Sequence, residues 1–569
     1  MGTYSYYKQT EDADLDKFIG NVNLEGNAFS SSLSATYDKQ DMFPEAPCSV
    51  LNEFGMNRFY VPVQYGGSLS SYEQLIDLWR TISRHDLTVA IGHGKTSLGG
   101  ICTWLAGSPE QANTLGKNII NGDVVSWGLT ERYHGSDLLA NEFEARETPQ
   151  GWVINGEKWL INNATRGDMI CVLALTDPQL GARGYSLFLI DKRKLSSTDY
   201  RLLPKEHTYG IRGADISGIE FQNAVISSDT MVGERGAGLE IVLKALQLTR
   251  TSCVGLSLGA ADHAFNLVFD FVKQHRMYDR YLIELPMVRR TLAETYVKLM
   301  IAELVSVVSS RSIHALTGEM SVISAIAKAF VPTMVDELIA QLGDQLGSRA
   351  FLTEEYKHGM FQKLERDHRL IAIFDGSTVV NRNALINQFH LLARSYKKGN
   401  YDKDGLAQTM NLNDELNKIN PEKLQLVSIS GCSILQSLPQ AVEQLRTLII
   451  NKKLTETRLL ALAETLLEET NALIEKLSAC VLSAREVPQS HFELAAQYEL
   501  CFAGAACIQL WLHNSDNSSG RFSQALWMEV CLTHLLKRLN SEFKFDTSIY
   551  EKFLTSIISE KFNSQVSMS

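Results

Sequence analysis

Hydrophobic and polar positions along the chain predict three successive regions. Residues 1–122 show helical periodicity, as in 71–79, with a break at Pro62 and Gly66. Residues 236–395 return to long helical periodicity, as in 289–300. Between them lie short segments rich in β-branched and aromatic residues, separated by turn residues: 124–129, 151–154, 169–175 and 185–190. The pattern predicts a mainly α protein with a central β-domain.

A polar, glycine-bearing stretch follows the second helical region. Residues 396–405 and the pair Asn420-Pro421 predict a linker over 396–424. Residues 425–569 are again helical in pattern, as in 454–464. This C-terminal extension has two interpretations: it packs on the core or on another subunit, or its amphipathic helices dock a carrier, a partner or a membrane.

Composition narrows the class of protein. The 569 residues are 45% hydrophobic, which suits large buried cores, and no run approaches 18 consecutive apolar residues. The N-terminal residues show no secretory or transit pattern, so we expect a cytoplasmic protein without a transmembrane segment. A net charge of −11 argues against nucleic acid as the main ligand. The nine cysteines are scattered without metal-site spacing, which predicts core thiols in a reducing compartment and no bound metal.

One carboxylate is a candidate for chemistry. Asp375 follows an apolar run and precedes Gly376, where the backbone bends freely and lets another group approach. An apolar pocket raises the pKa of a carboxyl group, the condition for removing a weakly acidic carbon-bound proton near pH 7. An Asp-Gly pair is also a common simple turn, and that alternative stands when these two residues are considered alone.

Five segments in one order resemble a known family. They are Val61-Pro-Val-Gln-Tyr-Gly-Gly67, Leu129-Thr-Glu-Arg-Tyr-His-Gly-Ser-Asp137, Asn155-Gly-Glu-Lys-Trp-Leu-Ile-Asn-Asn163, Arg366-Asp367 and Phe374-Asp-Gly-Ser377. With these motifs the chain resembles the acyl-CoA dehydrogenases, a flavoprotein family, over about residues 15–395. The resemblance implies an N-terminal helical domain (1–122), a middle β-barrel-like domain (123–235) and a C-terminal four-helix bundle (236–395). The linker (396–424) and an extra helical domain (425–569) follow, as in larger bacterial-type members.

The resemblance implies an FAD-dependent oxidoreductase that removes two hydrogens from adjacent carbons of an acyl thioester, as in fatty acid metabolism. Asp375 occupies the position where most members carry the catalytic glutamate, and its backbone N–H is expected to donate to the thioester carbonyl. In some relatives a base precedes the arginine matched by Arg250, but here that residue is Thr249, which cannot serve. Arg250, Phe374 and Gly376 are the expected substrate contacts.

The cofactor contacts carry over residue by residue. Thr130 and Ser136 match the loop beside the flavin ring and a flavin phosphate, while Arg276 matches an arginine that reaches the FAD pyrophosphate from a neighbouring subunit. Gln341 matches the start of an adenine-contacting loop whose usual Gly-Gly pair is here Asp344-Gln345. The remaining expected contacts are Trp127, Leu129, Leu160, Asn162 and Ser377. Leu160 and Asn162 depart from the family, which usually has Trp and Thr or Ser there.

Simpler roles stand beside these assignments. The alternative for Arg276 and Arg366 is a structural role in ion pairs, which arginine often makes in partly buried positions. The alternative for Thr130 and Ser136 is that they are turn or cap residues, and the alternative for Trp127 is that it is a core residue. Glu157 and Lys158 are expected in a hairpin turn.

The resemblance also implies partners. We expect a homodimer or homotetramer, since the contacts of Arg276 and Gln341 are made across a subunit interface in the family, and an electron-transfer partner. The acyl group is carried on coenzyme A or on an acyl carrier protein. Because aspartate is one methylene shorter than glutamate, two alternatives remain open: a flavin oxidase of the same fold, like the nitroalkane oxidases, and a non-catalytic flavin-binding or scaffold protein.

Overall fold

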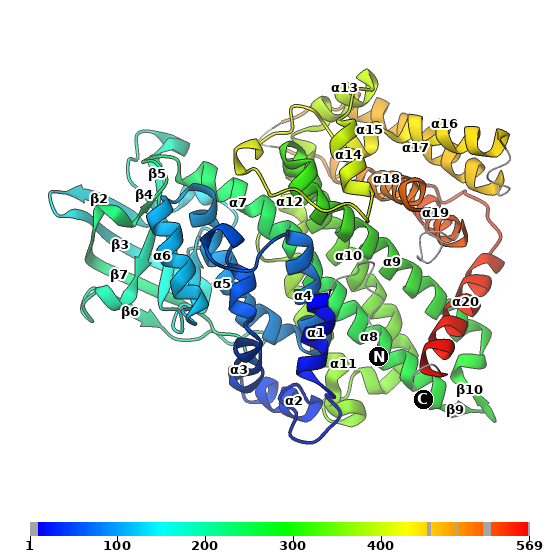
Figure 1. Ribbon diagram of the computed structural model, residues 1–569, viewed down its shortest axis with the longest axis horizontal. Helices are drawn as coiled ribbons and strands as arrows, with labels where there is room; N and C mark the ends of the chain where they lie inside the picture. The colour runs from blue at the N-terminus through cyan, green and yellow to red at the C-terminus, as the bar shows by residue number, and fades with distance from the viewer. Residues whose placement is uncertain (1–9, 452–456, 484–485, 516–524, 567–569) are drawn as a thin grey trace. The chain divides into compact units, whose positions relative to one another are not determined.

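The computed structural model describes residues 10–451, 457–483, 486–515 and 525–566. These residues form two compact units (Figure 1). The sheet unit comprises the described residues of Gln9–Gly259 and Thr353–Leu370. The bundle unit comprises the described residues of Ala260–Leu352 and Ile371–Ser569. The N-terminal helices and the β-domain expected from the sequence therefore fall in the same unit.

Side-chain caps set where several helices of the sheet unit begin. Ser71 Oγ accepts the backbone N–H of Gln74, and Ser108 and Gln111 form a reciprocal capping box. The first of these caps opens α4, which confirms the helix predicted over 71–79. The helices are α1 (Thr10–Ile19), α2 (Ser31–Lys39), α3 (Glu45–Phe54), α4 (Tyr72–His85), α5 (Leu87–Ala106), α6 (Pro109–Ile120), α7 (Gly238–Ser252) and α11 (Glu355–His368).

Between residues 125 and 232, all of them described, the chain forms an eight-stranded sheet with the order β6-β7-β3-β2-β4-β5-β8 and with β1 paired to β4. The strands are β1 (Val125–Gly128), β2 (Glu144–Thr148), β3 (Gly151–Asn162), β4 (Met169–Leu175), β5 (Tyr185–Asp191), β6 (Tyr200–Leu203), β7 (Ile216–Ile226) and β8 (Met231–Val232). All four β-segments predicted from the sequence are confirmed as strands. The β1–β4 pair is parallel, whereas β3–β7 and β4–β5 are antiparallel.

Aromatic side chains fill the core of the sheet. Phe143 meets Phe221 edge-on at 5.7 Å between ring centroids, and Trp152 meets Phe188 at 5.3 Å. Gly99 brings α5 against β1, because a Cβ at this position would lie 2.4 Å from the Val125 carbonyl oxygen. The strand that leads into the predicted flavin loop is thus fixed against a helix.

Long helices make up the bundle unit. The first part contains the C-terminal portion of α8 (Val254–Gln274), the hairpin β9 (Arg276–Met277) and β10 (Arg280–Tyr281), α9 (Pro286–Ala315), α10 (Met320–Leu346), α12 (Thr378–Ile386) and α13 (Phe389–Lys398). The second part contains α14 (Lys403–Met410), α15 (Ser433–Gln436), α16 (Leu438–Ile450), α17 (Thr457–Ala479), α18 (Gln489–Asn514), α19 (Ala525–Leu539) and α20 (Ser548–Val566). The helix predicted over 289–300 is confirmed within α9.

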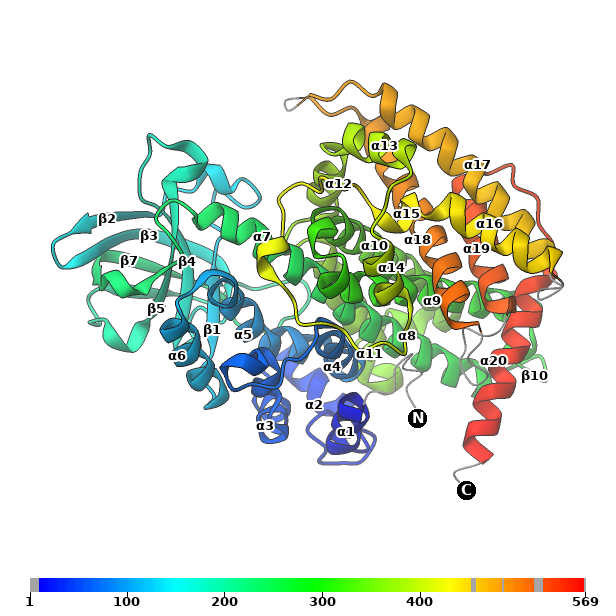
Figure 2. The same cartoon turned by 45° about the horizontal axis from the view of Figure 1, so that its top comes forward.

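The C-terminal extension packs through α17, α18 and α19, which lie against one another (Figure 2). Helix α18 also packs on α12, and α17 packs on α13. Helix α17 covers the described part of the segment predicted over 454–464, whose first three residues lie outside the described residues. The stretch predicted as a linker holds one short helix, α14, and a 3-10 turn at Pro421–Lys423. The domain boundaries remain a prediction.

The described cysteines are all free thiols, and eight of the nine are buried, as expected for core residues. Among the described residues, no cluster of His, Cys, Asp or Glu is arranged to hold a metal ion. Within the same residues, no helix is both long enough and apolar enough to cross a membrane.

Candidate active site

The predicted base lies in a strained turn. Asp375 has φ +52° and Gly376 has φ +93°, in the segment that leads into α12 in the bundle unit. A left-handed conformation is uncommon for a residue with a side chain, although Asp adopts it more readily than most. Such a residue persists only where its surroundings hold it, and it is a frequent feature of functional sites.

A buried lysine binds the backbone of this turn. Lys328, on α10, is fully buried, and its Nζ donates to the carbonyl oxygens of Ile371 at 2.5 Å and Gly376 at 3.3 Å. The same ammonium lies 5.1 Å from the ring centroid of Phe374. A single cation thus contacts both ends of the segment that carries Asp375. Charge-assisted hydrogen bonds in a dry environment are the strong ones, so the turn is rigidly placed.

The start of α12 holds the other side of the turn. Asn381 Nδ2 donates to the carbonyl oxygens of Gly376 and Ser377, both at 2.9 Å. Ser377 is the N-cap of α12, because its Oγ accepts the backbone N–H of Val380 at 3.3 Å. The cap uses the hydroxyl as an acceptor and leaves its proton for donation, so the expected cofactor contact of Ser377 remains a prediction.

The predicted flavin loop follows β1 in the sheet unit. Trp127 and Leu129 are buried, with 3% and 9% of their surfaces exposed, and Lys95 lies 5.9 Å from the Trp127 ring centroid. Ser136 is exposed. Among the described residues, neither the Thr130 nor the Ser136 hydroxyl makes a hydrogen bond, so both are available to a ligand. The Thr130 carbonyl, in contrast, accepts the N–H of Trp159 at 3.0 Å and thereby joins this loop to β3.

A buried ion pair orders the same loop. Lys158 Nζ lies 2.8 Å from Glu131 Oε1, and the Glu131 carboxylate also accepts the backbone N–H groups of Glu142 and Phe143. Burial lowers the pKa of Lys158 to about 8, although Glu131 opposes this effect. The prediction that Glu157 and Lys158 lie in a hairpin turn is wrong: both are inside β3, because pairing with β7 extends this strand to Asn162.

The end of β3 presents two predicted cofactor residues at a bulge. Leu160 has φ +55° and is 42% exposed, at a register shift between Trp159 and Ile161. Asn162 is 8% exposed, and its Nδ2 donates to the Ile91 carbonyl at 3.1 Å, while its Oδ1 has no partner among the described residues. An exposed apolar side chain beside an unsatisfied buried acceptor suits a surface that a flat polar ligand covers.

Three further predicted residues lie on helices or a hairpin. Arg276, in β9, is exposed; it donates to the Asp279 carbonyl at 3.1 Å and lies 5.1 Å from the Tyr281 ring centroid. Gln341, on α10, has a buried Oε1 without a partner among the described residues. Arg250 lies half-buried in the last turn of α7. Their roles toward cofactor or substrate remain predictions.

The Arg366-Asp367 motif has a structural role within the sheet unit. Arg366 pairs with Asp38 at 2.6 Å between Nη2 and Oδ2 and donates to the Tyr209 carbonyl at 2.9 Å. Asp367 accepts the backbone N–H of Ile211 at 2.5 Å and the Lys363 ammonium at 2.8 Å. The ion-pair alternative for Arg366 is therefore confirmed.

The predicted residues fall into two groups, one in each unit. The bundle unit holds Arg276, Gln341, Phe374, Asp375, Gly376 and Ser377, and the sheet unit holds Trp127, Leu129, Thr130, Ser136, Leu160, Asn162 and Arg250.

Sequence reasoning missed Lys328 and Asn381, which hold the Asp375 turn. Lys328 carried a usable signal, since it is a lone charge in the apolar run 325–331.

The fold is mainly α with a central β-domain, and comparison with known proteins places it among known families. Residues 126–224 match the model of the acyl-CoA dehydrogenase middle domain, and residues 236–389 match that of the acyl-CoA dehydrogenase C-terminal domain. The chain is 27% identical to the probable acyl-CoA dehydrogenase FadE25 of Mycobacterium tuberculosis over 352 residues, which are 61% of this chain and 88% of the relative.

Solved structures extend the likeness. An acyl-CoA dehydrogenase complexed with FAD from Bacillus anthracis aligns with a TM-score of 0.69 at 17% identity, over 97% of this chain and 95% of that chain. The prolyl acyl carrier protein oxidase AnaB aligns with a TM-score of 0.60 at 18% identity, over 67% of this chain and 97% of that chain. At these identities the structures show the fold alone. The chain thus carries the middle and C-terminal domains of the acyl-CoA dehydrogenases, followed by extra C-terminal helices.

Proposed function

We propose that the protein catalyses the FAD-dependent α,β-dehydrogenation of an acyl thioester, with Asp375 as the base that removes the α-proton. The observation that carries the proposal is the strained turn at Asp375, held by Lys328 on one side and Asn381 on the other. Strain that is maintained by buried charge-assisted bonds is expected where a reactive group has to be placed accurately.

The residues present fit the cofactor. Oδ1 of Asn162 and Oε1 of Gln341 are buried acceptors without partners among the described residues, and the hydroxyls of Thr130 and Ser136 are free there. FAD offers hydroxyl and amide donors to the first pair and phosphate acceptors to the second. The residues that we propose to hold it are Trp127, Leu129, Thr130, Ser136, Leu160, Asn162, Arg276, Gln341 and Ser377. When bound, FAD supplies an acceptor for the hydride of the β-carbon.

The remaining chemistry belongs to the chain itself. The Asp375 carboxylate accepts the α-proton of the thioester, and its backbone N–H donates to the thioester carbonyl as negative charge develops on that oxygen. Phe374 and Gly376 border the acyl group, and Arg250 contacts the substrate. We further propose an electron-transfer partner and a homo-oligomer, in which Arg276 of one copy would contact the cofactor held by a neighbouring copy.

The test is flavin reduction by the Asp375→Asn variant. Asn is nearly isosteric but cannot accept the α-proton, so the variant should retain FAD and lose anaerobic flavin bleaching by a saturated acyl thioester, by roughly 10³-fold or more. Asp404→Asn, at an exposed position on α14, is the matched control and should bleach at the wild-type rate. Bleaching by the Asp375→Asn variant at the wild-type rate would show that Asp375 is not the base.

The oxidase alternative is favoured by the shorter acid at the base position, and the same preparation tests it. Slow reoxidation in air supports a dehydrogenase that needs a partner. Rapid, stoichiometric peroxide formation, or bleaching by a nitroalkane but by no thioester, supports an oxidase instead.

A further inference from the structure

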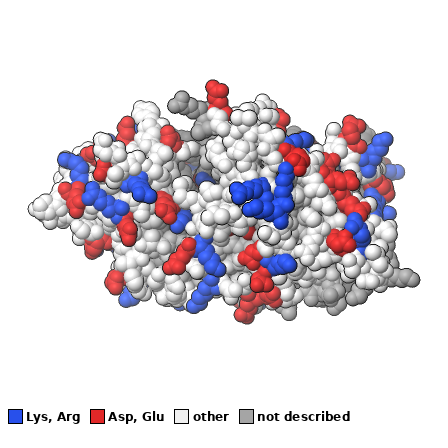
Figure 3. Space-filling view, turned by 90° about the horizontal axis from the view of Figure 1, so that it is seen from above, with Lys and Arg blue, Asp and Glu red and all other residues white. Residues whose placement is uncertain are grey.

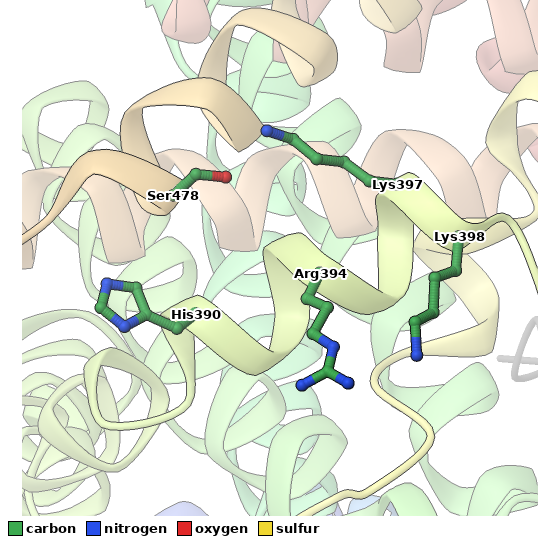
Figure 4. A pocket seen from close by; sticks show the side chains of 5 residues that line it. All are labelled: His390, Arg394, Lys397, Lys398 and Ser478. Atoms are coloured by element: carbon green, nitrogen blue, oxygen red, sulfur yellow. The ribbon is translucent and has the colours of Figure 1, made fainter.

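A basic face on α13 borders a surface cavity of about 440 Å³ in the bundle unit. His390, Arg394, Lys397 and Lys398 line it from α13, and Ser478 lines it from the end of α17 (Figure 4). The spacing of four, three and one residues places the four basic side chains along one side of a helix. The face seen in Figure 3, turned toward the end of the bundle unit that bears α13, shows a compact group of Lys and Arg side chains.

Two of these cations are not neutralised. Lys397 pairs with Glu475 at 2.7 Å, and His390 Nε2 lies 2.7 Å from the Cys480 carbonyl oxygen, to which it donates. Arg394 and Lys398 make no hydrogen bond or ion pair among the described residues, and both are exposed. Figure 4 shows their side chains leaving the same side of α13. Like charges at this spacing repel each other, so an anionic group placed between them stabilises both.

Exposed apolar side chains flank the basic face. Leu426, Val427 and Ile429 are 44%, 49% and 74% exposed, on a segment tied to α13 because Ser428 N–H donates to Oε1 of Gln388 at 3.0 Å. Val481 is 82% exposed and directly follows Cys480, whose carbonyl contacts His390. A small apolar rim beside a cationic stripe is typical of a protein-docking surface, where charge orients a partner and apolar contact holds it.

The face is close along the chain to the predicted base. Helix α12 begins directly after Ser377, is nine residues or about 13 Å long, and is joined to α13 by Asn387 and Gln388. A protein bound at α13 therefore docks one helix away from Asp375 in the same unit. The chain as a whole has a net charge of −11, so the cations on α13 are a local feature and not a sign of a basic protein. Such a local excess of positive charge favours an acidic partner.

From this arrangement we infer that the basic face of α13 docks the acidic surface of a carrier protein that bears the acyl thioester on a flexible arm. The inference rests on the proposed function and specifies its substrate class. Acidic side chains on one helix of the carrier pair with Arg394 and Lys398, and apolar residues of that helix cover Leu426, Val427 and Ile429. Exposed pairs of this kind mainly speed association and are screened by salt.

Binding is tested directly with a fluorescently labelled acyl carrier protein and the full-length flavoprotein. The variant pair Arg394→Glu and Lys398→Glu should weaken binding by about tenfold or more, and raised salt should weaken the wild-type complex. The charge-matched pair Lys418→Glu and Lys423→Glu, at exposed positions that do not line the cavity, should bind within about twofold of wild type. The neutral pair Arg394→Gln and Lys398→Gln should weaken binding by an intermediate amount. This graded result would show that the loss of binding follows the charge and does not come from misfolding.

Turnover with two forms of the same acyl group completes the test. The Arg394→Glu, Lys398→Glu variant should raise KM for the acyl carrier protein with kcat unchanged, and should leave flavin reduction by the acyl-CoA unaltered. Equal binding by all variants, no carrier binding, or binding only to anionic phospholipid vesicles would overturn the docking inference. Flavin that no thioester reduces in the wild-type protein would instead overturn the proposed function, which this assay reports separately from binding.

Discussion

Arg382 on α12 and Glu499 on α18 form a two-bonded ion pair, with Nε–Oε1 and Nη2–Oε2 distances of 2.8 Å. The Glu499 side chain is 1% exposed and the Arg382 side chain 22%. Burial raises the pKa of Glu499, and Arg382 opposes this rise. The pair joins the C-terminal extension to α12, which begins three residues after Asp375, so the extension supports the segment that carries the proposed base.

This pair predicts a specific pattern of stability. Arg382→Met leaves a buried, unpaired carboxylate and should destabilise the protein by about 3–5 kcal/mol. Adding Glu499→Leu removes that carboxylate and should restore much of the loss, since an apolar pair of similar volume often replaces a buried ion pair. Urea unfolding of both single variants and the double variant measures the coupling. Additive losses in this cycle would mean that the two side chains do not stabilise each other.

The buried cation beneath the Asp375 turn predicts a change in activity rather than in fold. Lys328→Met keeps the length of the side chain and removes the donor to the Ile371 and Gly376 carbonyls. We expect flavin reduction to fall by about 10²-fold, because a misplaced base is costly, while the far-ultraviolet circular dichroism stays unchanged. Lys298→Met, at another lysine of the bundle unit that pairs with Glu337, is the control and should reduce its flavin normally.

The Asp375→Glu variant tests whether the pocket is adapted to aspartate or whether Asp375 is an imperfect replacement for glutamate. If the site is built around the shorter acid, Asp375→Glu should crowd the substrate and lower the rate of flavin reduction by about tenfold or more. We expect this outcome, since Lys328 and Asn381 both hold the turn in its present position. Stopped-flow bleaching with one acyl thioester measures it, and a faster variant would show that Asp375 replaces glutamate imperfectly.

Retention of FAD is predicted to depend on Arg276. Its guanidinium is exposed and engaged only by the Asp279 carbonyl and the Tyr281 ring among the described residues. Arg276→Ala removes the proposed charge-assisted contact to the pyrophosphate and should weaken FAD binding by about tenfold or more. Arg280→Ala, in the same hairpin, is the matched control. The ratio of flavin absorbance to protein absorbance after dialysis measures retention, and equal loss from both variants would contradict a specific contact.

A buried carboxylate predicts a pH-dependent stability. Glu319 is 3% exposed and accepts the backbone N–H of Ser433 at 2.7 Å; burial raises its pKa to about 7, although its hydrogen bonds with Ser433 and Ser430 lower it. The unfolded chain loses this proton near pH 4.5, so the contribution of Glu319 is fully present below that pH and is lost as the pH rises through 7. The wild-type free energy of unfolding should fall from pH 5 to 8 relative to Glu319→Gln. A constant difference across this range would contradict the raised pKa.

Local sequence determined many of the helices and strands and the turn at the candidate site. The strands at 169–175 and 185–190 are short apolar segments bounded by turn residues, and the structure forms them where predicted. The placement of Asp375 before Gly376 predicted a turn, and the turn exists with positive φ at both residues. Such features depend on near neighbours in the chain, which is why sequence reasoning found them.

Tertiary structure alone decided what holds the site. Lys158 changed from an expected turn residue to a buried strand residue because it pairs with Ile219, 61 positions away, and meets Glu131 in the core. Lys328 reaches Gly376 across 48 positions, and Arg382 reaches Glu499 across 117. A buried charge is tolerated only where distant segments bring it a partner, and no local pattern specifies which segments those are. The sequence indicated the groups that we propose to be reactive, and packing between remote helices and strands determined which residues hold them in place.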